Sequence, residues 1–197
     1  MNIQMIAVSN CNKSRYYAEI CTRAWEDLGY DVHIFEATTP ATLTNALKFS
    51  EKKFNGNPFT EIEKAIWESH YRLWAYVLRN GPTYIIEHDT YPTKKLPEFS
   101  GPFSLFSIFP RNDEAWQGRK EVLSPGSGYY IDKTMASLLI DYAVSKEINQ
   151  NVDGHIFQTL KIISGMKTDE FEKYWCERAT CFQLVNYDVG TSAEHNV

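Results

Sequence analysis

This chain lacks the features that would place it in a membrane or outside the cell. Its 197 residues contain no apolar run that approaches the roughly 20 residues of a membrane-spanning helix. The start, Met1–Val8, has no basic segment followed by a long apolar stretch, so it does not resemble a signal peptide. The four cysteines show none of the close pairs typical of zinc sites, and we expect reduced thiols. These absences predict one soluble, cytoplasmic domain over residues 1–197.

An excess of positive charge, internal repeats and low-complexity segments are also missing. The formal net charge is −5, which argues against a broad binding surface for nucleic acid or an anionic membrane. Aromatic residues, in contrast, are abundant, with 12 Tyr, 11 Phe and 5 Trp. Part of this set belongs in a core, and the surplus suits a site that stacks on nucleobases or sugars.

Strand-like and helix-like segments alternate along the chain. Strands are predicted for residues 3–8, 32–35, 83–86, 103–109, 129–131 and 182–187. Helices are predicted for residues 14–28, 39–49, 61–79 and 169–179, and from residues 132 and 153 onward. Loops are predicted for residues 51–58 and 110–127. This order is typical of an α/β fold in which helices flank a mostly parallel sheet.

The segment Glu87-His88-Asp89 is the most informative feature, because it follows the buried strand predicted at 83–86. Side chains two apart on a strand point to the same side, so Glu87 and Asp89 are expected to project together. Ligands of open α/β sheets bind beyond the carboxyl ends of the strands. Two carboxylates there suit a divalent cation that also grips a phosphate. The alternative is an acidic loop that only caps or is solvated.

Three further positions have both a structural and a functional interpretation. His70 lies in the apolar stripe of helix 61–79, either as a core histidine bonded to a backbone carbonyl or as a contact to substrate. Asp153 opens a helix and is either its N-cap or a general base. His155 is a candidate contact to a phosphate or a metal.

Two polar segments are candidates for covering a bound ligand. Trp116 lies in the predicted loop 110–127 among Arg111, Arg119 and Lys120. It is either a packing anchor in a solvated loop or part of a lid that stacks on sugar and meets phosphate. The tail at 190–195 is either disordered or folded over a diphosphate.

The residues before the acidic triplet resemble a known family. Residues 59–74, with Ser69, His70 and Trp74, are similar to a helix of family 25 glycosyltransferases, the lipooligosaccharide and collagen galactosyltransferase group. In that family the next strand ends in Glu-Asp-Asp, where this chain has Glu87-His88-Asp89. The segment from Gly126 to Ile131 resembles the family's Gly-x-x-Gly-Tyr segment, and Val152-Asp153 resembles its Val-Asp segment.

This resemblance implies a Rossmann-like fold of the GT-A type and an inverting hexosyltransferase. The expected donor is a nucleotide-diphospho-sugar, with uridine diphosphate as the nucleotide and galactose or glucose as the sugar. The expected acceptor is a hydroxyl of a glycan, a protein or a modified nucleobase. By resemblance, Asp89 would coordinate Mn²⁺ or Mg²⁺, with Glu87 on the ribose or the metal and His155 as a further ligand. Asp153 would deprotonate the acceptor.

Five positions are expected by the same resemblance to line the donor site. They are Arg15, Ala37, His70, Glu87 and Gly128.

Two other functions compete with the transferase. One is a non-catalytic module that binds a nucleotide sugar or a partner on the same fold. The other is a metal-dependent phosphohydrolase, which ranks last because the sequence offers no second tight acidic cluster for a two-metal site.

Overall fold

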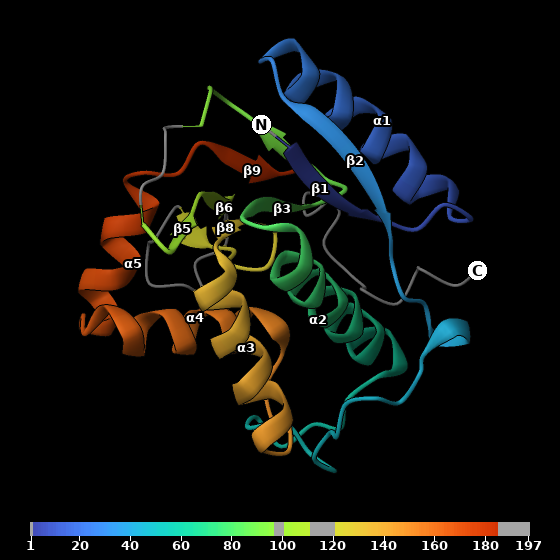
Figure 1. Cartoon of the computed structure of the whole chain (residues 1–197), viewed down its shortest axis with the longest axis vertical. Coiled ribbons are helices and arrows are strands. Elements are labelled where there is room, and N and C mark those ends of the chain that lie inside the picture. Colours follow the sequence, from blue (N-terminus) through green and yellow to red (C-terminus); the bar gives the residue numbers. More distant parts are fainter. Residues whose placement is uncertain (1, 97–100, 111–120, 185–197) are drawn as a thin grey trace.

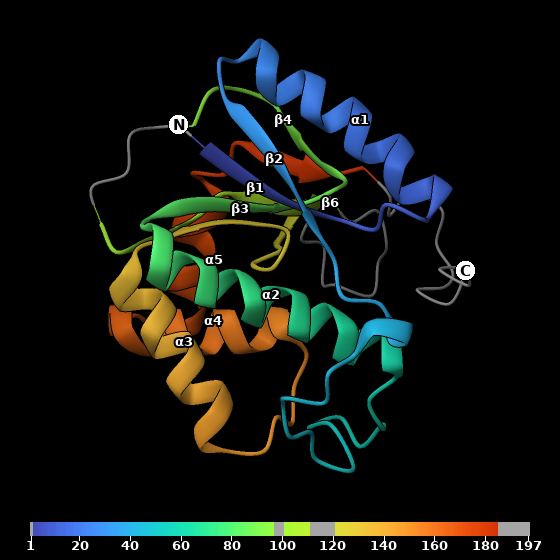
Figure 2. The same cartoon turned by 45° about the vertical axis from the view of Figure 1, so that its right-hand side comes forward.

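The main sheet runs through the centre of the protein, and helices cover both of its faces (Figures 1 and 2). The structure is a computed structural model that describes residues 2–96, 101–110 and 121–184, and for 109, 110, 121 and 122 the backbone only. The sheet has the strand order β2-β1-β3-β8-β5. Its strands are β1 (Asn2–Ala7), β2 (Asp31–Glu36), β3 (Thr83–Glu87), β8 (Gly128–Ile131) and β5 (Phe103–Leu105).

The directions of these strands confirm the predicted α/β class. β1 pairs in parallel with β2 and with β3. β8 is antiparallel to both β3 and β5, so every strand of this sheet except β8 runs in one direction. The carboxyl ends of β1, β2 and β3 therefore meet at one edge, and the chain that leads into β8 arrives at the same edge.

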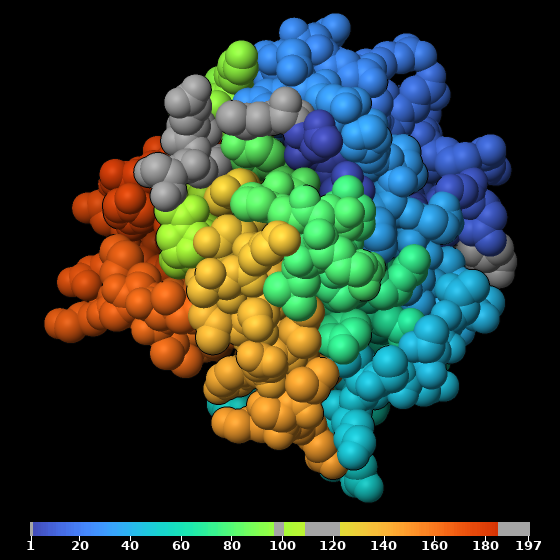
Figure 3. All heavy atoms as spheres, viewed as in Figure 1, coloured from blue at the N-terminus to red at the C-terminus, as the bar shows by residue number. Residues whose placement is uncertain are grey.

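The helices divide between the two faces of the sheet (Figure 2). The helix α1 (Asn12–Asp27) covers one face, while α2 (Glu61–Asn80), α3 (Lys133–Ser145) and α4 (Val152–Ser164) lie on the other. In the space-filling view of Figure 3, the segment of α1 and the segments of α3 and α4 occupy opposite parts of the visible face. A last helix, α5 (Thr168–Cys176), leads toward a second sheet.

The second sheet consists of short strands in the order β4-β9-β6-β7. They are β4 (Thr90–Pro92), β9 (Cys181–Gln183), β6 (Ser107–Pro110) and β7 (Glu121–Leu123). β4 follows β3 after a two-residue turn, and β9 lies beside it. This sheet brings the end of the described chain next to the carboxyl edge of the main sheet.

The alternation of β3 explains why the protein has two hydrophobic cores. Ile85 packs in the cluster under α2, whereas Tyr84 and Ile86 pack in the cluster under α1. Successive side chains of a strand point to opposite faces, so a strand that is apolar throughout must be covered on both sides. Glu87, two residues after Ile85, therefore lies on the α2 face.

Capping chemistry sets the start of α2 as the sequence predicts. The Thr60 hydroxyl accepts from the Glu63 N–H at 3.2 Å, and the Glu63 carboxylate accepts from the Thr60 N–H at 2.9 Å. Together these bonds satisfy two donors that a bare helix end would leave unpaired. Gly81 ends the helix with a φ of +107°, a conformation that favours glycine. The predicted cap of α3 is also confirmed, because Asp132 accepts from the Met135 N–H at 2.8 Å.

The helix predicted at 39–49 is wrong beyond its first turn, η1 (Pro40–Thr42). Two residues after this turn, the Thr44 N–H is held by the buried Glu68 carboxylate of α2 at 3.1 Å. Asn45 then takes a φ of +57°, which a right-handed helix does not permit. A tertiary contact thus overrides the local helix signal of Thr39-Pro40.

The single strand predicted at 103–109 is also wrong, because the chain changes sheets at Phe106. The Phe106 N–H bonds to Gly128 in the main sheet at 3.2 Å. Its carbonyl accepts instead from Thr180 and Cys181 in the second sheet, at 2.9 and 3.2 Å. The pattern of residues 103–109, which are apolar except for Ser104 and Ser107, does not reveal such a transfer. The strands β4 and β7 were likewise not predicted.

Candidate active site

Four elements place polar side chains at the carboxyl edge of the main sheet, on its α2 face. Glu87 is the last residue of β3, and Ser127 directly precedes β8. Asp153 is the second residue of α4, whose N-cap is Asn151, so the alternative that Asp153 is itself the cap is wrong. Gln183 is the last residue of β9. This is the edge at which open α/β sheets bind ligands.

Glu87 is held as an anion by three neighbours. Its Oε2 accepts from the Ser127 hydroxyl at 3.1 Å and from the Gln183 amide at 2.8 Å. Its Oε1 lies 3.8 Å from Nε2 of His70. Burial alone would raise the pKa of this carboxyl, but His70, the charge of His88 and the Ser127 hydroxyl outweigh burial and lower it. Glu87 therefore stays ionised although only 24% of its side chain is exposed.

Asp153 behaves in the opposite way. Burial raises its pKa most, and the charge of Glu87 raises it further. A bond from the Gly126 N–H to Asp153 Oδ1 at 2.7 Å and the nearby His70 lower the pKa, but they do not reverse the shift. A pair of carboxyls whose pKa values are pushed apart is typical of an acid–base site, in which the group with the raised value exchanges a proton.

The segment from Ser124 to Ser127 joins the two carboxyls. Gly126 contacts Asp153 through its N–H, and Ser127 contacts Glu87 through its hydroxyl. A Cβ on Gly126 would lie 3.0 Å from Asp153 Oδ1, so a glycine allows this close approach. Ser124 adds contacts to Ser127 at 2.6 Å and to Gln183 at 3.1 Å. One turn thus fixes the relative position of both acids.

The predicted same-side projection of Glu87 and Asp89 is wrong. Alternation holds only within a strand, and β3 ends at Glu87; His88 and Asp89 form the turn into β4. The buried Asp89 accepts from the Leu184 N–H through its carbonyl, and its charge raises the pKa of the Cys21 thiol. Cys21 belongs to the cluster under α1. The charge of Asp89 therefore acts on the α1 side of the sheet, whereas Glu87 lies on the α2 face.

The prediction that His155 contacts a phosphate or a metal is wrong as well. Its Nε2 lies 3.2 Å from the Leu139 carbonyl, which can only accept, so this nitrogen carries the proton. The rings of Trp67, Trp74 and Tyr142 surround the imidazole at centroid distances of 4.7, 5.6 and 5.7 Å. Burial lowers its pKa to about 4, so it is a neutral core histidine.

Gly128 was predicted to let a ligand approach, but the structure gives it a packing role. A Cβ there would lie 2.9 Å from both the Phe106 ring and Ser107 Cβ. The space beside Gly128 is filled by the chain's own crossing between the two sheets. Packing therefore requires a glycine here, and the predicted donor contact of Gly128 stays a prediction.

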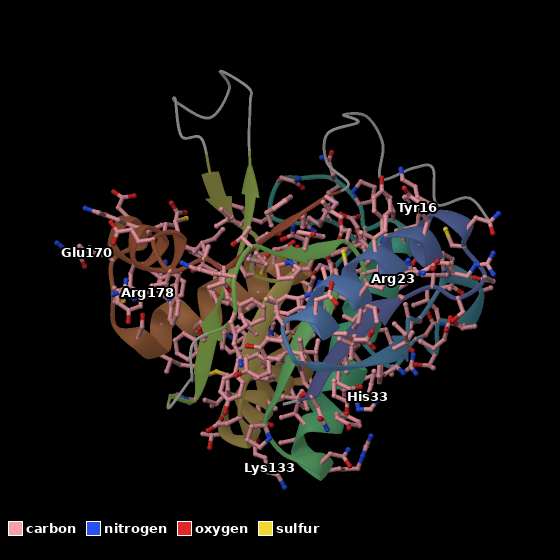
Figure 4. All side chains as sticks on the ribbon, turned by 90° about the horizontal axis from the view of Figure 1, so that it is seen from above. Tyr16, Arg23, His33, Lys133, Glu170 and Arg178 are labelled. Atoms are coloured by element: carbon pink, nitrogen blue, oxygen red, sulfur yellow. The ribbon has the colours of Figure 1, made fainter. Side chains whose placement is uncertain are left out.

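Ala37 and Arg15 lie near the carboxyl ends of β1 and β2. Ala37 is buried and donates to Ala7 at 2.8 Å, and the next N–H, of Thr38, is held by the Ser69 hydroxyl of α2 at 2.8 Å. Arg15 is exposed and contacts Asn12 at 2.5 Å. It lines a shallow groove of about 390 Å³ beside α1, on the helix that carries Tyr16 and Arg23 in Figure 4. Their donor contacts stay predictions.

His70 differs from both interpretations that its sequence position suggested. Its Nδ1 lies 2.8 Å from the Tyr129 hydroxyl rather than from a backbone carbonyl. The ring is fully buried, so a direct contact to substrate is excluded in this state. Its other nitrogen faces Glu87, which makes it a support for the site. This finding corrects its predicted place in the donor site.

Three contributors to the site were missed by sequence reasoning. Tyr129 was assigned only to a strand, although its position in the Gly-Tyr segment could have indicated it. Ser127 carries a similar signal in the same segment. Gln183 lies 96 positions after Glu87 in a short strand, and nothing in the sequence identifies it.

The predicted metal set does not fit as a whole. Oε2 of Glu87 already has two donors, and His155 lies in the core. Across the described ranges, no group of three or more His, Cys, Asp and Glu residues is placed to hold a metal ion. Of the predicted ligands, only Asp89 stays a candidate. The segments of Trp116 and the tail at 190–195, predicted as a lid and a cover, lie outside the described residues.

Comparison with known proteins gives glycosyltransferases of similar structure. The galactosyltransferase LgtC in complex with donor and acceptor sugar analogues has a TM-score of 0.46 and 13% identity, over 94% of this chain and 87% of that chain. An active-site mutant of LgtC gives a TM-score of 0.46 and 11% identity, over 94% of this chain and 87% of that one.

A glycosyltransferase involved in the glycosylation of the major capsid of PBCV-1 gives a TM-score of 0.43 and 11% identity, over 98% of both chains. No protein-family model and no curated protein matches the sequence. Among the helices of the described ranges, none is long and apolar enough to cross a membrane.

Proposed function

We propose that this protein is a glycosyltransferase that moves a hexose from a nucleotide-diphospho-sugar to an acceptor hydroxyl. The observation that carries the proposal is the pair Glu87 and Asp153, joined by the turn at Gly126-Ser127 at the carboxyl edge of the sheet. One acid is held ionised and the other has a raised pKa. The resemblance of residues 59–89 to family 25 glycosyltransferases points to the same chemistry.

In the proposed reaction, Asp153 accepts the proton of the acceptor hydroxyl as its oxygen attacks the anomeric carbon of the donor. The bond between that carbon and the diphosphate oxygen breaks, and the nucleoside diphosphate leaves with the bonding electron pair. Attack from the face opposite the leaving group inverts the anomeric centre. A base with a raised pKa suits this step, because it is a stronger proton acceptor than an ordinary aspartate once it is ionised.

The donor is proposed to lie across the carboxyl ends of β2, β1 and β3. Ala37 and Arg15 would contact the nucleoside, with uridine as the expected base. The groove beside α1 supports this placement for Arg15. The acceptor class is unassigned among glycan, protein and modified nucleobase hydroxyls. A cytoplasmic location likewise stays a prediction.

A requirement for Mn²⁺ or Mg²⁺ is a separate proposal. When bound, such an ion neutralises charge on the leaving diphosphate. Magnesium sites often use one or two carboxylates together with substrate phosphates, so Asp89 alone would suffice on the protein side. We expect transfer to be lost on chelation and restored by Mn²⁺. Asp89→Asn should raise the Mn²⁺ concentration needed for half-maximal rate by about 10-fold or more; an unchanged requirement would remove Asp89 from the proposal.

The deciding experiment is a screen of nucleotide sugars, with and without Mn²⁺, for thermal stabilisation and for release of nucleoside diphosphate. A uridine diphosphate sugar that stabilises the fold and is turned over supports the transferase. Stabilisation without turnover, across a broad acceptor panel, would identify a non-catalytic binding module instead. Release of phosphate from simple esters would identify a phosphohydrolase. No response to any nucleotide sugar would contradict the proposal.

A further inference from the structure

A chain of buried polar contacts runs from the hydrophobic core to Glu87. Nε1 of Trp74 lies 2.9 Å from the Tyr129 hydroxyl, and that hydroxyl lies 2.8 Å from Nδ1 of His70. Nε2 of His70 lies 3.8 Å from Oε1 of Glu87. Trp74, Tyr129 and His70 are each fully buried. Polar groups in such surroundings must satisfy one another, because water does not reach them.

The chemistry of the groups fixes the direction of each bond. An indole N–H can only donate, so the Tyr129 oxygen accepts from Trp74. The buried hydroxyl of Tyr129 must then donate its own hydrogen bond, and Nδ1 of His70 is the acceptor within reach. If Nδ1 carried a proton instead, the Tyr129 oxygen would accept from both Trp74 and His70. The buried hydroxyl proton of Tyr129 could then no longer be donated to Nδ1. The favoured arrangement has a bare Nδ1 and the imidazole proton on Nε2.

We propose that Trp74 and Tyr129 are positioning residues that hold His70 as the Nε2–H tautomer, with its only ring proton directed at Glu87. Neither residue touches the carboxylate, so both act through the histidine. The tautomer follows from contacts in the structure, while its effect on rate rests on the proposed transferase function.

The consequence for the site is a buried N–H that faces Oε1 of Glu87 across 3.8 Å, a distance longer than a hydrogen bond, on the side that Ser127 and Gln183 leave open. Those two residues both bond to Oε2, whereas His70 faces Oε1. The Nε2–H bond directs the positive end of its dipole at the anion. The negative charge of Glu87 then acts on Asp153. Trp74, Tyr129 and His70 would thereby influence the proposed base, Asp153, through the charge of Glu87 and without contacting Asp153.

The tautomer can be measured directly by nitrogen NMR of the histidine ring, independently of any activity. In protein labelled with ¹⁵N-histidine, we expect His70 to show a protonated Nε2 and an unprotonated, hydrogen-bonded Nδ1. His70→Gln identifies its resonances. Trp74→Phe removes the bond that occupies the Tyr129 oxygen, so Tyr129 becomes able to accept from Nδ1–H. We expect a second tautomer in that variant. A protonated Nδ1 in the unmodified protein, or one unchanged tautomer in Trp74→Phe, would overturn the proposal.

The matched control is Trp25→Phe. Trp25 is equally buried and its indole also donates over 2.9 Å, but it donates to the Thr90 carbonyl on the α1 face. We expect this variant to leave the His70 spectrum unchanged. A spectrum altered as much as in Trp74→Phe would mean that a general loss of core packing, rather than the loss of one hydrogen bond, changes the tautomer.

Kinetics extend the test to the transferase. Tyr129→Phe should lower kcat about 10-fold, the size expected from one hydrogen bond of about 1.4 kcal/mol, without changing the donor KM. Trp25→Phe should leave both constants unchanged. Equal losses in the two variants would overturn the positioning role. If the protein transfers no sugar at all, the proposed function fails while the NMR result still decides the tautomer.

Discussion

The two faces of the main sheet each contain a buried tryptophan whose indole donates one bond of 2.9 Å, and the two bonds have different consequences. On the α1 face, Trp25 donates to the Thr90 carbonyl, where the contact ends. On the α2 face, Trp74 donates to the Tyr129 hydroxyl, which in turn donates a hydrogen bond to Nδ1 of His70. A carbonyl only accepts, whereas a hydroxyl also donates. The acceptor therefore decides whether a buried bond stays structural or reaches a carboxylate.

The same contrast separates the acids at the end of β3. Glu87 lies on the α2 face among donors that keep it ionised, beside an aspartate with a raised pKa. The charge of Asp89 acts on the Cys21 thiol of the α1 face. Residues two apart in sequence thus belong to different chemical environments. The comparison predicts that substitutions in contact with Glu87 or Asp153 on the α2 face change catalysis, while those on the α1 face change stability or metal use.

The largest effect is expected for Asp153→Asn. Removal of a general base should lower kcat by about 10²–10⁴-fold. The folded protein should become more stable at pH 7, because burial and Glu87 raise the pKa of Asp153 and so make its ionised form unfavourable in the folded state. The amide oxygen can still accept from the Gly126 N–H. A rate assay and a melting curve at pH 7 test both parts, and near-normal kcat would remove Asp153 from the reaction.

A shift of the pH–rate profile is expected for Glu87→Gln. Asp153 must be ionised to accept a proton, so kcat/KM should fall as pH decreases through its raised pKa. The negative charge of Glu87 helps to raise that pKa. Its removal should therefore move the acid limb of the profile to lower pH. Asp132→Asn, which changes a carboxylate at the cap of α3, serves as a control with an unmoved limb. An acid limb that stays in place in Glu87→Gln would show that the charge of Glu87 does not raise the pKa of Asp153.

Much of the fold could be predicted from sequence, because it depends on local patterns. The capping box of Thr60 and Glu63 and the stop at Gly81 define α2, and the apolar run before Glu87 defines β3. The exceptions are segments whose structure is determined by residues that are distant in sequence. Glu68 interrupts the helix predicted after Thr39, and Phe106 divides its hydrogen bonds between two sheets.

The candidate site was predicted only in part for the same reason. Glu87 and Asp153 follow from their positions after a strand and at a helix start. Gln183 comes from a short strand whose place depends on the second sheet. His70 and His155 look alike in sequence, since each lies on the apolar stripe of a helix. Only the hydrogen-bond partner of each ring, a hydroxyl for His70 and a carbonyl for His155, distinguishes them.

His155→Gln tests this distinction through stability. The pKa of His155 is lowered from 6.5 to about 4 in the folded protein, so between these values only the unfolded chain takes up the proton. The contribution of His155 to the free energy of unfolding should therefore be fully present above pH 6.5. It should decrease by about 3 kcal/mol as pH falls toward 4. His155→Gln should lack this part of the acid dependence, as measured by urea unfolding at several pH values. Parallel curves for the two proteins would show that His155 is not buried as a neutral ring.

The smallest effect concerns the cysteines of the α1 face. Burial raises the pKa of the Cys21 thiol to about 12, and the charge of Asp89 adds to this shift. Cys181 is also buried, whereas Cys11 and Cys176 are partly exposed. A thiol reagent at pH 8 should therefore label Cys11 and Cys176 in the native protein well before the other two. Because burial is the larger cause, Asp89→Asn should leave Cys21 protected. Rapid labelling of Cys21 in that variant would mean that Asp89 holds the α1 face closed, which would make it a structural rather than a metal-binding acid.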